Sequence, residues 1–133
     1  MIVVDSNIIC YLYIEGEFTS KCEKLLQKDN NWIAPLLWKS EFRNVLSFYY
    51  RKEILSQNDI LQIIEEAESL MKQKEFDVNS QSVIDFVTQS NLSAYDCEFI
   101  ALANEFDVPL VTTDQKIIKT FPKIAYHLKD YIK

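Results

Sequence analysis

Residues 1–7 read Met-Ile-Val-Val-Asp-Ser-Asn, and this stretch decides the class of fold. Residues 1–4, which are apolar and mostly β-branched, are typical of a short strand that is buried on both faces of a sheet. The polar residues that follow end the strand, and Asp5 or Ser6 is suited to cap a helix that begins at once. A buried strand followed directly by a helix predicts an α/β protein with a parallel sheet.

The same alternation continues along the rest of the chain. Further strands are predicted at 32–34, 76–78, 110–112 and 124–126, with helices at 19–28, 35–52, 56–72, from 80 or 82, 94–105 and 116–120. Helices that alternate with strands cover both faces of a parallel sheet. We therefore expect one domain over residues 1–133, a three-layer α/β/α sandwich whose central, mostly parallel sheet has four or five short strands.

The composition restricts the partners that this chain can have. Twenty acidic residues against fourteen basic ones give a net charge of −6, the wrong sign for gripping nucleic acid through charge alone. No apolar stretch approaches the roughly 20 residues that span a bilayer. The first residues lack the basic start of a secretory signal. No membrane partner and a cytoplasmic location are therefore expected.

Cysteine and histidine are too few for several familiar sites. The three cysteines, Cys10, Cys22 and Cys97, are odd in number and never form Cys-x-x-Cys, so reduced packing residues are expected in place of disulfides or a zinc site. His127 is the only histidine, which argues against a Ser-His-Asp triad or a two-histidine zinc site. It is expected at the surface or at an edge of the fold.

Four acids stand where apolar or small side chains are expected: Asp5, Glu41, Asp96 and Asp114. Asp5 and Asp114 each follow an apolar strand, and the other two interrupt the apolar stripes of helices, read for Glu41 as Leu37, Glu41, Val45 and Phe48. A carboxylate at the edge of a core is costly unless it is paired or binds a metal. Because ligand sites in parallel sheets lie beyond the carboxyl ends of the strands, all four can reach one place.

A cluster of this kind predicts one shared site for a hard divalent cation, Mg²⁺ or Mn²⁺, with all four acids as metal ligands and catalytic groups. Neutral side chains beside them are suited to orient a carboxylate or a metal-bound water; these are Ser6, Asn7, Thr112 and Thr113.

Helix capping is the alternative explanation for three of the acids. Asp5 could cap the first helix, and Asp114 could cap the short helix that follows Asp114 itself. Asp96 forms Ser-x-x-Asp with Ser93, a pattern like a capping box. Capping does not explain Glu41 in a helix body, although a shift of one residue in the helix register would expose it.

Together these residues resemble the PIN-domain family in order and spacing. The resemblance rests on Val4-Asp5-Ser6-Asn7, Ser40-Glu41, Leu92-Ser93-Ala94-Tyr95-Asp96-Cys97 with Ile100-Ala101-Leu102-Ala103, and Leu110-Val111-Thr112-Thr113-Asp114. It covers essentially the whole chain. Within the family the chain is most similar to the VapC toxins of bacterial and archaeal toxin–antitoxin pairs.

That resemblance implies an endoribonuclease that depends on Mg²⁺ or Mn²⁺ and hydrolyses RNA phosphodiester bonds with an activated water. It also implies that the four acids form the quartet that holds the metal, with Ser6 and Thr112 as supporting residues. It also implies a homodimer and a small antitoxin protein as partners, with RNA as substrate.

Two other classes of function stay open from the sequence. The same carboxylates could serve a DNA-directed nuclease or a phosphatase-type hydrolase, since these chemistries use similar metal clusters. A catalytically silent protein-binding module of the same fold is the other alternative. Tyr49 and Tyr50, beside Arg51, could stack on bases or could be ordinary helix-face residues.

Overall fold

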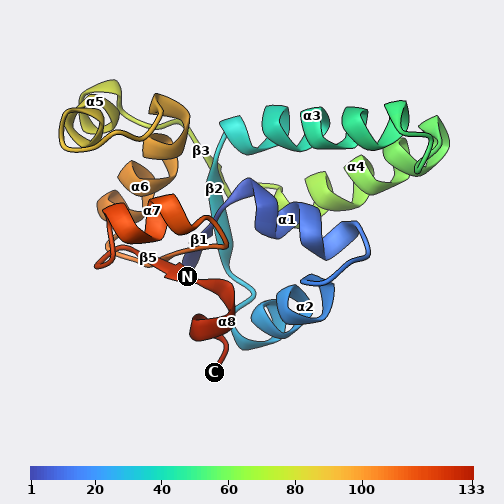
Figure 1. Cartoon of the computed structure of the whole chain (residues 1–133), viewed down its shortest axis with the longest axis horizontal. Coiled ribbons are helices and arrows are strands. Elements are labelled where there is room, and N and C mark those ends of the chain that lie inside the picture. Colours follow the sequence, from blue (N-terminus) through green and yellow to red (C-terminus); the bar gives the residue numbers. More distant parts are fainter.

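The expected alternation of strands and helices is present in the computed structural model, which describes all residues from 1 to 133 (Figure 1). Five strands form one sheet in the order β3-β2-β1-β4-β5, and every neighbouring pair is parallel. The strands are β1 (Ile2–Val4), β2 (Trp32–Pro35), β3 (Glu75–Phe76), β4 (Leu110–Thr112) and β5 (Ala125–His127). The prediction of a three-layer α/β fold with a parallel sheet is confirmed.

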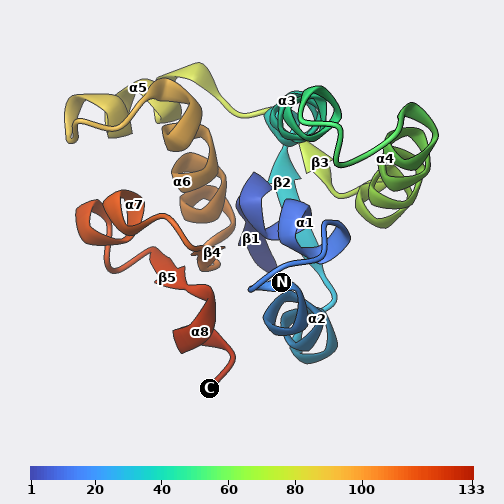
Figure 2. The ribbon, with the colours of Figure 1, turned by 45° about the vertical axis from the view of Figure 1, so that its right-hand side comes forward.

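A helix follows every strand, and the helices form the two outer layers. They are α1 (Ser6–Tyr13), α2 (Thr19–Lys28), α3 (Leu37–Arg51), α4 (Gln57–Met71), α5 (Ser80–Thr88), α6 (Ala94–Phe106), α7 (Gln115–Thr120) and α8 (Leu128–Tyr131). On one side α6 packs against β1, β2 and β4 and is covered by α5. On the other side lie α1, α2 and α4 (Figure 2). None of the helices combines the length and the apolar character that crossing a bilayer requires.

The core is built around β1, the central strand. Its three residues have no exposed surface, which explains why they read as a continuous apolar run. Val3 is in register with Ile33 on β2 and with Leu110 on β4. In α6, all five residues from Phe99 to Ala103 are buried because the helix lies between the sheet and α5.

The strand order decides where a ligand site can form. From β1 the chain moves outward to β2 and β3 and then returns to add β4 and β5 on the opposite side of β1. The direction of winding therefore changes between β1 and β4, and in parallel sheets ligands bind at such a switch point, beyond the carboxyl ends of the strands. Asp5 follows β1 and Asp114 lies two residues beyond β4, so this topology places both acids at the switch point.

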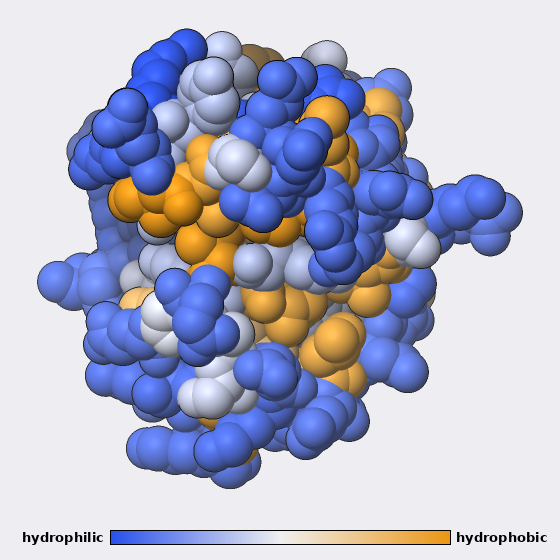
Figure 3. Space-filling view, turned by 90° about the vertical axis from the view of Figure 1, so that its right-hand side faces the viewer, coloured by the Kyte–Doolittle hydropathy of each residue, from blue (hydrophilic) through white to orange (hydrophobic).

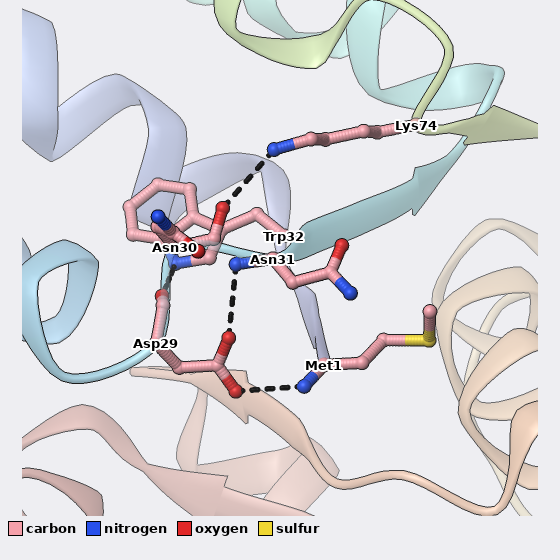
Figure 4. A network of polar contacts seen from close by, with 6 residues as sticks. All are labelled: Met1, Asp29, Asn30, Asn31, Trp32 and Lys74. Carbon is pink, nitrogen blue, oxygen red and sulfur yellow. Dashed lines mark hydrogen bonds and ion pairs between the residues drawn. The ribbon is translucent and has the colours of Figure 1, made fainter.

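At the opposite edge, a polar network fixes the start of the central strands (Figure 4). The Asp29 carboxylate accepts hydrogen bonds from the Met1 amine at 2.8 Å and from the backbone N–H of Asn31 at 2.9 Å. The Trp32 indole donates to the Asp29 carbonyl at 2.8 Å, and the Lys74 amine donates to the Asn30 carbonyl at 3.0 Å. The Asp29-Asn30-Asn31 turn thus ties β2 to β1 and to the chain before β3.

Helix α3 differs from its predicted register. The helix buries Trp38, Phe42 and Leu46, one residue further on than the predicted stripe of Leu37, Glu41, Val45 and Phe48. The Trp38 and Phe42 side chains are almost fully buried, and they pack on one another with ring centroids 5.5 Å apart. Glu41 and Val45 are half-buried on the flank of the helix, and Phe48 is 55% exposed.

The C-terminal segment holds a further difference. The short helix α8 was not predicted, and His127 at its start is buried on the edge strand β5. Its Nδ1 accepts a hydrogen bond from the backbone N–H of Lys129 at 3.1 Å, so the ring caps α8. The expectation of an edge position is met, but that of a surface position is wrong. The three cysteines are free and buried, as expected.

Three helix ends in this chain use residues other than glycine in the left-handed conformation. Glu53, Gln73 and Asp107 have φ of 61°, 65° and 53°, and they follow α3, α4 and α6. We expect Gln73→Gly to raise the free energy of unfolding by about 1 kcal/mol, because a Cβ is disfavoured at this φ. Urea denaturation of the purified variant measures this change.

Gln89 is the matched control, since it also ends a helix but has φ of −94°. Gln89→Gly should lower the stability by about 0.5–1 kcal/mol through the added backbone entropy of the unfolded chain. A change of the same sign in both variants would show that backbone conformation does not determine the effect.

Candidate active site

A chain of hydrogen bonds joins three of the predicted acids through Ser6 and Thr112. The Ser6 hydroxyl donates to Glu41 Oε1 at 2.6 Å, and the Ser6 backbone N–H donates to Asp5 Oδ1 at 2.7 Å. The Thr112 hydroxyl donates to Asp5 Oδ2 at 2.7 Å and accepts from the backbone N–H of Asp114 at 3.0 Å. Each hydroxyl therefore holds one carboxylate from another element: Ser6 holds that of Glu41, and Thr112 holds that of Asp5.

Helix capping explains how two of these acids are oriented. Asp5 is the N-cap of α1, and Asp114 is the N-cap of α7, where its Oδ1 accepts from the backbone N–H groups of Lys116 at 2.9 Å and Ile117 at 3.2 Å. The capping alternative is therefore correct for both residues. It does not exclude the site hypothesis, because a cap uses a carboxylate on its backbone side and leaves other lone pairs available.

Asp96 reaches the same place from the first turn of α6. Ser93 caps this helix by accepting a hydrogen bond from the backbone N–H of Asp96 at 3.1 Å. The reciprocal bond of a capping box, from the backbone N–H of Ser93 to the Asp96 carboxylate, is absent. The complete capping box of the chain is at Ser56 and Asp59, at the start of α4. The Asp96 carboxylate is thus not committed to its own helix.

All four acids line one cavity of about 530 Å³ at the carboxyl edge of the sheet. Ser6 and Asn7 line it as well. The N-termini of α1, α6 and α7 carry Ser6, Asp96 and the residues after Asp114, so three helix dipoles direct partial positive charge to this edge. Acids from α3, α6 and the ends of β1 and β4 are thereby brought together, although they are far apart in the sequence.

Burial, and after it repulsion between the carboxylates, raises the pKa values of Asp5, Glu41 and Asp96 in this cavity. The pKa of Asp5 rises from 3.8 to about 7, mainly because the carboxyl group is buried and also because of the charges on Glu41 and Asp96. Burial and then the charge on Asp96 raise the pKa of Glu41, and burial and then the charge on Asp114 raise that of Asp96. The protein alone supplies too little positive charge here, so a bound cation would relieve the repulsion.

The side chains fit a hydrated hard cation. The donor atoms are all oxygens, and the buried Asn7 Oδ1 in the wall of the cavity accepts no hydrogen bond. No group of three histidine, cysteine or acidic side chains is arranged to hold one ion directly. Mg²⁺ is commonly held by one or two carboxylates and keeps several of its waters, and the cavity has room for these.

Of the predicted supporting residues, two lie outside the cavity wall. Thr112 is fully buried behind it and acts through Asp5 and Asp114. Thr113 does not line the cavity either, but its hydroxyl lies 3.5 Å from that of Tyr11, which does. The predicted roles of the quartet and its supporting residues stay predictions, to be tested below.

Sequence reasoning missed the outer part of the cavity. Glu15 and Glu17, in the loop between α1 and α2, lie on its wall. Two acids in a loop give no signal of a site in a sequence that has 20 acidic residues. The wall also includes Tyr11 of α1 and Tyr49 of α3.

Removing the Thr112 hydroxyl should have a large effect for a change of one atom. In Thr112→Val the side chain keeps its shape, but one Asp5 oxygen and the Asp114 N–H lose their partner. We expect the free energy of unfolding to fall by about 1–3 kcal/mol. Chemical denaturation measures the stability, and Thr112→Ser is the control that keeps the hydroxyl. Equal stability of the valine variant and the wild type would contradict the role given to this hydroxyl.

Comparison with known proteins agrees with this geometry. The family model described as PIN domain matches residues 2–123. The ribonuclease VapC3 of Pyrobaculum aerophilum is 22% identical over 127 residues, which are 93% of this chain and 97% of that protein.

Solved structures with the same fold include a protein from Pyrobaculum aerophilum, with a TM-score of 0.78, 17% identity and coverage of 98% of this chain and 92% of that one. FitAcB from Neisseria gonorrhoeae has a TM-score of 0.77 and 12% identity, with 97% and 99% covered. A chain of a toxin–antitoxin complex from Klebsiella pneumoniae has a TM-score of 0.69 and 12% identity, with 96% and 98% covered.

Proposed function

This chain belongs to the PIN-domain family, and from that premise we propose that it is an endoribonuclease that depends on Mg²⁺ or Mn²⁺. The observation that carries the proposal is the convergence of Asp5, Glu41, Asp96 and Asp114 on one cavity at the switch point of the sheet. The relative from Pyrobaculum aerophilum, named a ribonuclease, aligns along nearly the whole chain and supports RNA as the substrate.

The four acids would hold the hydrated cation in this proposal, directly or through its waters, with Asn7 Oδ1 as a further oxygen donor. Bound Mg²⁺ or Mn²⁺ would neutralise charge on the phosphodiester and make a water a better nucleophile. Ser6 and Thr112 fix the two oxygens of Asp5 and so set the direction in which this carboxylate faces. Glu41 receives one hydrogen bond, on Oε1, and its Oε2 is therefore available to accept a proton from the attacking water.

We further propose that the protein is the toxin of a toxin–antitoxin pair, acts as a homodimer and is covered by an antitoxin protein. The toxin–antitoxin complex from Klebsiella pneumoniae, one chain of which shares this fold, supports the proposal of such a partner. At the free end of the α3–α4 hairpin, Phe48, Ile54 and Leu61 are 55%, 60% and 55% exposed. Apolar side chains gather among polar ones on this face (Figure 3), as they do on surfaces that bind proteins.

Incubation of purified protein with total cellular RNA tests the enzymatic part of the proposal. We expect discrete fragments with Mg²⁺ or Mn²⁺ and none with EDTA. Asp96→Asn should abolish the fragments, whereas Glu105→Gln, an exposed acid on the same helix and outside the cavity, should leave them unchanged. The fragments then give the cleaved sequence.

The other classes of function predict different results in parallel assays. A DNA-directed nuclease would cut single- or double-stranded DNA under the same conditions, and a phosphatase-type hydrolase would release phosphate from monoesters without internal cuts. A silent binding module would bind no Mn²⁺ and would cut no substrate. Any of these three results, without RNA cleavage, would overturn the proposal.

A further inference from the structure

The cavity extends well beyond the carboxylates, along a groove between α1 and α3. On α3 it is lined by Glu41, Val45 and Tyr49, which lie four residues apart on one helix face. Because an α-helix rises 1.5 Å per residue, this stripe is about 12 Å long. A hydrated cation held by the acids would occupy the end next to Asp5, so the groove would have room for another part of the substrate.

Beyond the acids the groove is apolar on both sides. Cys10 of α1 and Ile14, which directly follows α1, line one side, and Val45 and Tyr49 of α3 line the other. The Tyr11 ring is already packed on Phe18, with centroids 4.9 Å apart. Tyr49 is half-buried in the groove wall and has no aromatic partner in the structure. The Tyr49 ring therefore offers an unpaired surface to whatever enters.

Charge at the rim decides which part of an RNA strand can enter. Glu15 and Glu17, both exposed, lie at this end of the cavity, and the cavity contains no basic residue. Phosphate groups are repelled at this rim, and their place is beside the cation at the other end. The uncharged, flat and partly apolar part of a nucleotide is its base.

We propose that the groove takes one unpaired nucleobase next to the cleaved phosphodiester bond, and that Tyr49 stacks on this base. This inference rests on the proposed ribonuclease function and deepens it, because it assigns the groove between α1 and α3, and the Tyr49 ring in its wall, to the base of the target nucleotide. A base inside a duplex cannot enter the groove without first leaving its stack. Stacking on an aromatic side chain tolerates every base. Tyr49 therefore requires that the base is unpaired but does not select which base it is.

The test compares variants at two neighbouring tyrosines of α3. Tyr49→Ala should lower kcat/KM on an RNA oligonucleotide that contains the mapped cleavage site by about 5- to 150-fold. Tyr49→Phe keeps the ring and should cleave like the wild type, and Tyr49→Leu keeps apolar bulk but should lose most of the effect of the ring. Tyr50→Ala is the matched control, because Tyr50 is 53% exposed and lies outside the cavity. Circular dichroism checks that each variant is folded.

A second substrate separates stacking from a structural role of the tyrosine. The same oligonucleotide is made with an abasic nucleotide on each side of the cleaved bond in turn. One of the two should be a poor substrate for the wild type, and Tyr49→Ala should cleave that abasic RNA at nearly the same rate as the intact RNA. Multiplicative losses from the variant and the missing base would overturn the inference.

The outcomes distinguish this inference from the function on which it rests. If the wild type cuts no RNA, the proposed function falls and the inference falls with it. If the wild type cuts RNA and Tyr49→Ala cuts it equally well, only the inference is wrong. Weaker binding of a protein partner by Tyr49→Ala, with cleavage unchanged, would likewise overturn it and assign the groove to a peptide.

Discussion

Asp5→Asn is expected to lower the rate of RNA cleavage by about 10³-fold, which corresponds to about 4 kcal/mol in the activation free energy. Asp5 is the centre of the hydrogen-bonded chain, with links to Ser6 and Thr112, and its charge acts on the cavity that the other three acids share. Asparagine keeps the size of the side chain but removes the charge that would hold a cation. Initial rates at saturating Mn²⁺ measure the loss.

The same substitution should make the metal-free protein more stable. At pH 8 the Asp5 carboxylate is ionised although it is buried beside Glu41 and Asp96, so removal of its charge relieves repulsion. We expect a gain on the order of 1–3 kcal/mol in the free energy of unfolding, measured with urea in the presence of EDTA. Lower activity together with lower stability would mean that Asp5 is mainly a structural cap.

The stability of the metal-free protein should fall as pH rises from about 4 to about 7. The pKa of Asp5 is about 7 in the folded state and 3.8 when unperturbed, so in this window the folded protein holds a proton that the unfolded chain has released. The free energy of unfolding therefore decreases with pH, by at most about 1.4 kcal/mol per pH unit from this one group. Below this window both states are protonated, and above it both are ionised, so the contribution of Asp5 becomes constant.

Urea denaturation in EDTA between pH 4 and pH 8.5 measures this slope. Glu41 and Asp96 contribute in the same direction because their pKa values are also raised. Asp5→Asn is the control, and the difference between its slope and that of the wild type isolates Asp5. Saturating Mg²⁺ should recover the stability lost at high pH, since a ligand that binds only the folded state stabilises it. Identical slopes in the two proteins would contradict the assigned pKa.

The layers of the fold could be predicted because local signals and burial agree. The β-branched runs at β1 and β4 are strands buried on both faces, and Ser56 with Asp59 forms a complete capping box where a helix was expected to start. The convergence of the four acids also followed from the sequence, since the topological rule for parallel sheets needs only the strand ends.

Other features depend on contacts that no local pattern encodes. The buried stripe of α3 includes Trp38 and Phe42 because the neighbouring elements accept two aromatic rings there, and periodicity alone also permitted the stripe one residue earlier. Thr113 was assigned to the site by adjacency; it does not line the cavity, and its hydroxyl lies 3.5 Å from that of Tyr11 in the cavity wall. The apolar groove beside the acids is formed by α1 and α3 together, so it could not be read from either helix.

Calorimetric titration of the purified protein with Mn²⁺ tests the shared site most directly, and it does not require an active enzyme. The wild type should bind Mn²⁺, and Asp5→Asn, Glu41→Gln, Asp96→Asn and Asp114→Asn should each weaken that same binding event by tenfold or more, as expected when oxygen ligands of one site are removed. Glu105→Gln should bind like the wild type. Absence of binding in the wild type, or wild-type affinity in the four variants, would contradict a cation site built from these carboxylates.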